Sequence, residues 1–211
     1  MSQPADPLTL AHWRRTVAEI YATARVAEER DPAGAAQAFR EARDSLFRIH
    51  PDSPITPERR RDWAGTRWFA YDPAWRFVAA IERTPHGMEF EIDLAQDGVL
   101  RCARVGYARF TRDGRATSLA LYWFEGYGGG LWLPFLDETS GAATYGGGRY
   151  LYDTIKGADL GIAGTEILLD FNFAYNPSCA YDDRWSCPLS PPENRLPFAV
   201  KAGERAPEWV A

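Results

Sequence analysis

The chain has 211 residues, a formal net charge of −5 and 45% apolar residues, which suffices for one domain with a substantial core. Its basic residues form no cluster of the kind that neutralises phosphates, so no nucleic-acid partner is expected. No apolar run approaches the length of about 18 residues that a membrane helix needs. We therefore expect a cytoplasmic protein with no membrane partner.

Two helices are predicted at the beginning of the chain. In residues 10–29, apolar residues recur at the three- and four-residue spacing of one helix face. Asp31 is then a typical helix N-cap, and Pro32 suits the first helical position. A second helix to about residue 49 would turn Phe39 and Phe47 toward the core.

The following part of the chain has the pattern of β-strands. In "MEFEIDL", residues 88–94, apolar and acidic residues alternate as in a half-buried strand. Roughly seven or eight such segments, several joined by short glycine-containing turns, favour an antiparallel barrel or sandwich-like sheet. The fold class is therefore α+β within one domain. Residues 1–66 form a helical arm and connector, residues 67–205 form the β body, and residues 202–211 form a surface tail.

The segment "PFLDETSGAATYGGGRYL", residues 134–151, is rich in turn-forming residues. Its three consecutive glycines can expose backbone N–H groups, and Arg149 offers a planar fork for a carboxylate or phosphate. These features suit an anion pocket, in which Tyr145 would orient the ligand. The alternative is a glycine hairpin in which Arg149 pairs with an acidic neighbour such as Asp170.

A second irregular segment, "DFNFAYNPSCAYDDRWSCPLSPPENRLPF", spans residues 170–198. Asp170 and Asn172 would share the polar face of a strand, as an acid/base candidate and a ligand contact. Asn176 suits either a ligand contact or a tight turn. Glu193 follows two prolines that stiffen the chain, and it suits either an acid/base role or an ion pair with an arginine.

Cys179 and Cys187 are separated by seven residues, and their chemistry stays open at this stage. A zinc site would need more ligands than the segment offers, and paired zinc ligands are usually closer together. A disulfide is geometrically feasible, although a reducing compartment disfavours it. Cys179 as a nucleophile would need a base and a lowered pKa. Buried, unreactive thiols are the remaining alternative.

These two irregular segments, in this order, resemble the domain of unknown function 1684 family (DUF1684). The upstream "SPI" at residues 53–55, "WFAYDPAWRF" and the late "AGE" fit the same resemblance. The resemblance implies no activity. It does imply that a set of residues belongs to the family pattern: Asp137, Thr139, Ser140, Tyr145, Gly148, Arg149, Asp170, Asn172, Tyr175, Asn176, Cys179, Cys187, Pro188, Glu193 and Asn194.

The leading hypothesis is a protein that binds a small, anionic ligand between the two segments, with catalysis left open and no cofactor assigned. Its candidate residues are Asp170, Cys179 and Glu193 for catalysis and Tyr145, Arg149, Asn172 and Asn176 for ligand binding. Two alternatives remain. One is a non-catalytic domain in which the same segments form a closed hydrogen-bond and ion-pair network. The other is a metal protein that uses Cys179 and Cys187.

Overall fold

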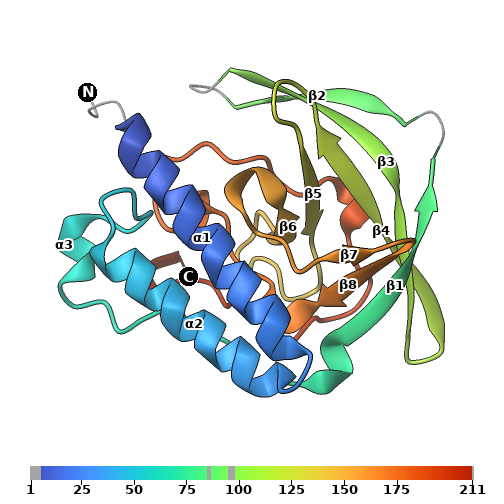
Figure 1. The fold of residues 1–211 in the computed structure, drawn as a ribbon, viewed down its shortest axis with the longest axis horizontal. Helices are drawn as coiled ribbons and strands as arrows, with labels where there is room; N and C mark the ends of the chain where they lie inside the picture. The colour runs from blue at the N-terminus through green and yellow to red at the C-terminus, as the bar shows by residue number, and fades with distance from the viewer. Residues whose placement is uncertain (1–5, 85–86, 95–97, 211) are drawn as a thin grey trace.

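The computed structural model describes residues 6–84, 87–94 and 98–210 (Figure 1). Residues 1–5 of the predicted arm and residue 211 of the predicted tail lie outside the described residues. The helices are α1 (Pro7–Glu28), α2 (Pro32–Ile49) and α3 (Pro57–Arg60). The strands are β1 (Arg76–Arg83), β2 (Glu89–Asp93), β3 (Val99–Arg112), β4 (Arg115–Phe124), β5 (Gly130–Phe135), β6 (Arg149–Asp153), β7 (Ile162–Ala163) and β8 (Glu166–Asp170).

Each helix begins with a proline that follows a capping side chain. The Asp6 carboxylate accepts a hydrogen bond from the backbone N–H of Leu8, and the Asp31 carboxylate accepts one from Gly34. Thr56 caps α3 in the same way. Each cap satisfies one of the N–H groups that a helix leaves free at its start, and the proline that follows has none to satisfy. The predicted start of the second helix is confirmed.

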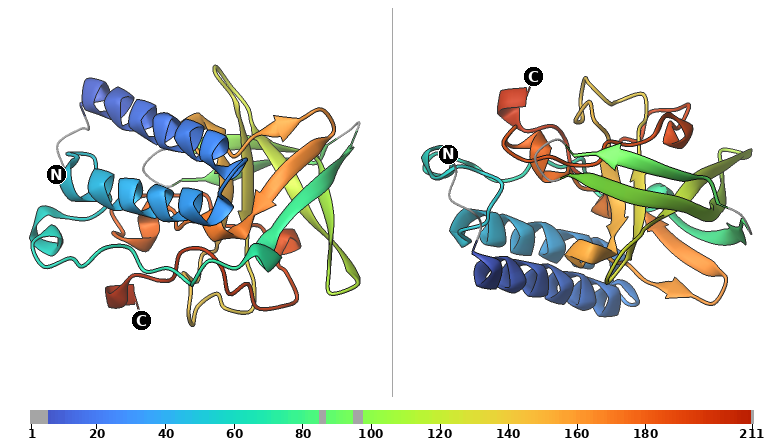
Figure 2. Two further views of the ribbon diagram at one scale, coloured as in Figure 1. Left: turned by 60° about the horizontal axis from the view of Figure 1, so that its bottom comes forward. Right: turned by 90° about the horizontal axis from the view of Figure 1, so that it is seen from above.

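The strands form one antiparallel sheet in the order β6-β5-β4-β3-β1-β8-β7, with β2 paired to β3. The 14-residue β3 pairs with β2 along its first part and with β1 after a bulge between Arg104 and Gly106. A Cβ on Gly106 would lie 2.5 Å from the backbone oxygen of Glu82, so only glycine allows this approach. The sheet curls into a half-barrel, as Figure 2 shows, and the predicted α+β class is confirmed.

Aromatic rings fill the space between the helix pair and the curled sheet. Phe171 is fully buried and makes edge contacts with Phe135 at 5.1 Å and with Trp75 at 6.0 Å between ring centroids. Phe39 of α2 meets Phe173 at 5.0 Å, and Tyr21 of α1 meets Phe39 at 5.1 Å. The two helices therefore join the same core as the sheet, on the side where β6 and β8 lie (Figure 1).

The segment of residues 200–206, called the C-terminal segment below, is mostly buried, whereas the sequence predicted a surface tail from residue 202. Ala202 is 0% and Glu204 1% exposed. The chain here pairs with the connector that leaves α3, because the Phe69 N–H donates to the Gly203 carbonyl at 3.0 Å and the Arg205 N–H to the Arg67 carbonyl at 2.7 Å. This part of the prediction failed because hydrogen bonds to a distant segment leave no periodic pattern.

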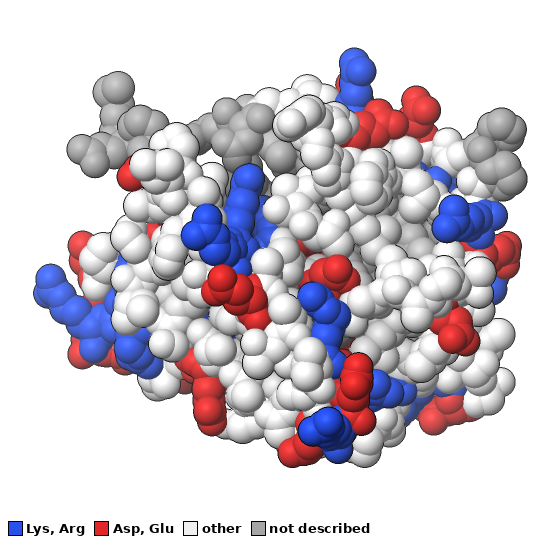
Figure 3. Space-filling model, in the orientation of Figure 1, with Lys and Arg blue, Asp and Glu red and all other residues white. Residues whose placement is uncertain are grey.

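The surface carries charges of both signs. On the face in Figure 3, basic and acidic side chains are interspersed and form no large area of one sign. Among the helices of the described residues, none combines the length and the apolar composition that crossing a bilayer requires.

Replacing Phe39 with Ala should lower the free energy of unfolding by about 3–5 kcal/mol, because the ring is buried and a cavity would remain between the helix pair and Phe173. Urea unfolding followed by circular dichroism measures the change. Val26→Ala is the control, because Val26 lies on α1 and is 71% exposed. An equal effect in both variants would show that Phe39 does not fix the helices to the sheet.

Candidate functional site

Arg149, at the first position of β6, lies buried against the C-terminal segment. Its side chain is 1% exposed, and Nη2 donates to Asp137 Oδ2 at 2.9 Å. The guanidinium also donates to the backbone carbonyls of Val200 at 3.0 Å, Glu204 at 3.3 Å and Ala202. Burial lowers the pKa of Arg149, and the charge of Asp137 opposes that shift. The residue predicted to anchor an anion therefore has partners within the chain.

Asp137, just after β5, supplies the negative charge of this cluster. Its Oδ1 accepts hydrogen bonds from the backbone N–H groups of Thr139 at 2.7 Å and Val200 at 3.1 Å. The alternative prediction paired Arg149 with an acidic neighbour such as Asp170. The structure shows Asp137 instead, because the antiparallel pairing of β5 with β6 brings the beginning of β6 beside the end of β5.

Asp170 and Asn172 form a second enclosed cluster. β8 ends at Asp170, whose Oδ1 accepts from the backbone N–H and the side-chain amide of Asn172 at 2.9 and 2.8 Å. Asn172 also bonds both backbone groups of Asp72, at 3.0 and 2.9 Å. Asp170 is 0% exposed, and this burial raises its pKa to about 7. The two side chains do not share a strand face, because a 3-10 turn, Phe171–Phe173, follows β8.

Asn176 holds Glu204 in place. The Asn176 N–H donates to Glu204 Oε2 at 2.9 Å, and its side-chain amide donates to the Arg205 carbonyl at 2.8 Å. Arg43, from α2, donates to the same Glu204 oxygen at 3.2 Å. Burial raises the pKa of Glu204 to about 7, and the charge of Arg43 opposes the shift. The predicted ligand contact Asn176 therefore positions a second buried carboxyl group.

Glu193 lies in a separate place, against the sheet. The Tyr122 hydroxyl donates to Glu193 Oε1 at 2.6 Å, and Arg104 Nη1 donates to Oε2 at 2.9 Å. Glu193 thus forms an ion pair with an arginine, which was the predicted alternative to an acid/base role. The next residue, Asn194, is 0% exposed and joins β4 to β5 through side-chain hydrogen bonds to their backbones.

Cys179 and Cys187 lie next to each other as free thiols. The Cys179 N–H donates to Cys187 Sγ at 3.4 Å, and the Tyr145 hydroxyl donates to Cys179 Sγ at 3.5 Å. A hydrogen bond between the two side chains raises the pKa of Cys179 and lowers that of Cys187 to about 6. Within the described residues, no three or more His, Cys, Asp and Glu side chains gather in a way that could hold a metal ion.

The predicted site residues are thus distributed over several clusters. Arg149, Asp170 and Glu193 have different partners and do not meet, either in one pocket or in one ion-pair network. Tyr145 and Cys179 come together, as do Asp170 and Asn172.

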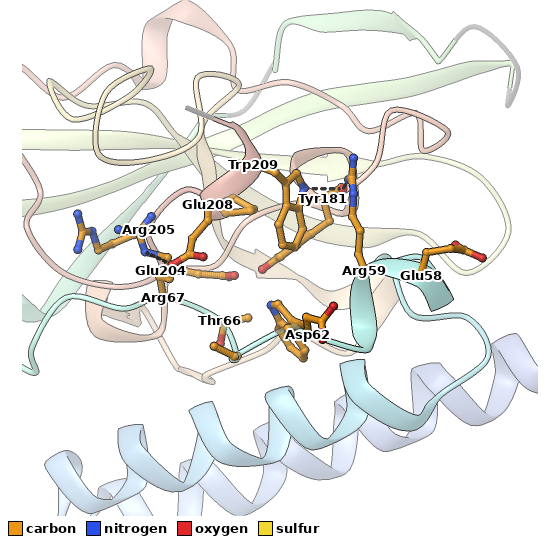
Figure 4. Close-up of a pocket in the computed structure, with 14 residues that line it drawn as sticks. Glu58, Arg59, Asp62, Thr66, Arg67, Tyr181, Glu204, Arg205, Glu208 and Trp209 are labelled. Carbon is orange, nitrogen blue, oxygen red and sulfur yellow. Dashed lines mark hydrogen bonds and ion pairs between the residues drawn. The ribbon is translucent and has the colours of Figure 1, made fainter.

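A cavity of about 410 Å³ lies on the other side of the C-terminal segment, between it and the connector around α3 (Figure 4). Of the residues in the candidate set, none lines this cavity. Its aromatic walls and charged groups come from Trp63, Tyr181 and Trp209 and from Glu58, Arg59, Asp62, Arg67, Glu204, Arg205 and Glu208.

Tyr181 lines this cavity and carries a buried hydroxyl without a partner among the described residues. Its carbonyl accepts hydrogen bonds from Arg59 at 2.9 Å and from the Trp209 indole at 3.1 Å, which fix the backbone. The side chain is 2% exposed, and its hydroxyl has no hydrogen-bond partner among the described residues. In Figure 4 this ring extends toward the space between Glu204 and Asp62. A buried hydroxyl without a partner is unfavourable unless something else bonds to it.

The cavity was not predicted from the sequence. Its lining comes from three separate stretches: α3 with the connector after it, the loop after Cys179, and residues predicted to be a tail. One available signal was the "AGE" that ends at Glu204, since a family resemblance that extends to that position argues against a tail.

The family pattern described as a protein of unknown function (DUF1684) matches residues 61–205. The chain belongs to the DUF1684 family. The matched range contains both irregular segments, together with Tyr181, Glu204 and Arg205 of the cavity. The resemblance inferred from the sequence is therefore confirmed.

A solution NMR structure of an uncharacterized protein from Haloarcula marismortui is similar to this DUF1684 chain. The two are 37% identical with a TM-score of 0.63, and the match covers 84% of this chain and 96% of that chain. A comparison with curated proteins finds no match. The two proteins therefore share a fold over most of their lengths.

Replacing Asp137 with Ala should lower the free energy of unfolding by about 3–5 kcal/mol, because it leaves Arg149 buried without its counter-ion. Urea unfolding measures the loss. Glu82→Ala is the control, since Glu82 pairs with Arg109 at the surface and its removal should change little. If the Asp137 variant were as stable as the control, the Arg149 cluster would not be an important contributor to stability.

Glu204 should make the stability depend on pH. Its folded pKa of about 7 lies above the ordinary 4.5, so its contribution is fully present below about pH 4.5 and is lost as the pH rises through 7. Glu204→Gln keeps the neutral form, so the variant should gain stability relative to the wild type between pH 5 and pH 8, by on the order of 3 kcal/mol. Urea unfolding curves of both proteins at pH 5 and at pH 8 measure this gain in stability. A difference between the proteins that is the same at both pH values would contradict the raised pKa.

Proposed function

We propose that this DUF1684 protein binds a small molecule in the cavity between the α3 connector and the C-terminal segment. The observation that carries the proposal is the Tyr181 hydroxyl, which is buried against the cavity and lacks a partner among the described residues. A ligand atom would supply the missing hydrogen bond.

The volume and the walls support a ligand of metabolite size. About 410 Å³ falls within the usual range for small-molecule sites, roughly 300–1,000 Å³. Trp63 and Trp209 offer flat apolar faces, and Arg48 and Arg59 lie over their rings at 5.2 and 5.1 Å. These contacts hold the indoles in place for a planar or cyclic ligand to pack against them.

Polar groups of the cavity wall would orient that ligand. Glu204 both accepts and donates hydrogen bonds near neutral pH, because its pKa is raised to about 7. Arg67 and Glu208 lie 4.0 Å apart at a more exposed position, which suits an entrance. We therefore infer a ring compound that carries hydroxyl or amino groups.

In this proposal the two irregular segments line the site only through Tyr181, and other residues in them support it. Arg149 fixes the C-terminal segment through Ala202 and Glu204, and Asn176 fixes the Glu204 carboxylate. The proposed ligand contacts are at Glu204 and Tyr181, in place of the anion contact that the sequence predicted at Arg149.

Tyr181→Phe should weaken ligand binding without lowering the melting temperature, because the lost hydroxyl has no partner within the described chain. Saturation-transfer NMR with a panel of hydroxyl- and amino-substituted ring fragments identifies a probe. Titration of the best fragment should then show that Tyr181→Phe binds it roughly 2- to 12-fold more weakly than the wild type does. This change corresponds to the loss of one hydrogen bond.

Tyr127→Phe is the matched control, since Tyr127 is fully exposed and lies in the β4–β5 turn. Its fragment affinity should equal that of the wild type. The proposal fails if no fragment binds to the wild type, or if Tyr181→Phe binds the best fragment as tightly as the control does.

A further inference from the structure

The thiol pair lies in the same loop as Tyr181. Cys179 belongs to a 3-10 turn, Ser178–Ala180, and Cys187 follows seven residues after it. The Cys179 N–H donates to Cys187 Sγ at 3.4 Å. The fold therefore already places the Cys187 sulfur against the backbone of Cys179.

The surroundings favour a thiolate on Cys187. Hydrogen bonds from the Cys179 thiol and from the backbone N–H groups of Ser178 and Cys179 stabilise it, and the charge of Lys156 adds to them. Together they lower the Cys187 pKa to about 6 in spite of burial. The Tyr145 hydroxyl bonds to Cys179 and helps to fix that sulfur beside its neighbour.

A small reagent can reach the pair. Both cysteines are only partly buried, and Cys179 lines an open cavity of about 360 Å³ with Arg59 and Asp182. Cys102 differs from this pair in exposure and in pKa. It is 1% exposed inside the sheet, and its burial raises its pKa to about 12. The chain thus contains an internal reference thiol that should be unreactive.

We propose that Cys179 and Cys187 form a reactive dithiol that a hydroperoxide oxidises to an intramolecular disulfide. This function goes beyond ligand binding at Tyr181 and does not depend on it. The pairing rests on the contact between the two residues and on their access to solvent.

The oxidation has two balanced steps. The Cys187 thiolate attacks the terminal oxygen of the hydroperoxide, the O–O bond breaks, and the alkoxide or hydroxide leaves and takes up a proton. The resulting sulfenic acid is then attacked by the Cys179 sulfur, which forms the S–S bond as water leaves with the thiol proton. Two thiols are oxidised and one peroxide is reduced to an alcohol or water and a further water.

The test uses the full chain, first reduced and then treated with hydrogen peroxide under native conditions. Alkylation followed by peptide mass spectrometry should find one disulfide, between Cys179 and Cys187, with Cys102 alkylated only after unfolding. Cys102→Ala should give the same disulfide at the same rate. Cys187→Ser should react with peroxide at least about 10-fold more slowly, since the remaining thiols are protonated. Cys179→Ser should leave a sulfenic acid on Cys187 that dimedone traps.

A second measurement needs no variant. Alkylation of wild-type Cys187 by iodoacetamide should reach half its maximal rate near pH 6. The proposal is overturned if native peroxide treatment gives no such disulfide, if Cys187→Ser reacts at the wild-type rate, or if the alkylation of Cys187 rises only near the pH of an ordinary thiol, about 8.5.

Discussion

A buried guanidinium constrains the second half of the chain. Arg149 keeps its charge in a protein, so its burial requires acceptors at fixed positions. Asp137 provides the carboxylate from the end of β5, and the C-terminal segment provides the carbonyls. That segment must in turn approach the core closely: at Gly203, with φ +79°, an added Cβ would lie 2.6 Å from the Phe171 carbonyl. One charge thereby determines where the last part of the fold lies.

The burial of Arg149 also positions candidate functional groups. Glu204 follows Gly203 directly, so the segment that neutralises Arg149 also delivers a carboxyl group to the cavity wall. On the far side of the cavity, Tyr181 lies two residues after Cys179 in the loop that carries both thiols. The proposed ligand site and the proposed dithiol are therefore neighbours that share a loop but use different chemistry.

Local features of the fold could be predicted from the sequence. Asp31 with Pro32 identified the start of α2, and alternating residues identified strands, because capping and burial act on near neighbours. The partners of Arg149 could not be identified, since its carboxylate lies 12 residues away and its carbonyl acceptors more than 50. Those carbonyls belong to the backbone, which every residue has. The cavity could not be predicted from the sequence for a similar reason, because its walls come from three separate stretches of the chain.

The Arg149 cluster can form only late in the synthesis of the chain. Arg149 leaves the ribosome 51 residues before Val200 and 55 before Glu204, whose carbonyls accept its hydrogen bonds. A nascent chain that ends before this point can pair β5 with β6, yet it cannot bury the guanidinium without leaving it short of acceptors. The β5–β6 end of the sheet therefore completes its folding only after residue 204 has emerged, and until then Arg149 lacks its native acceptors.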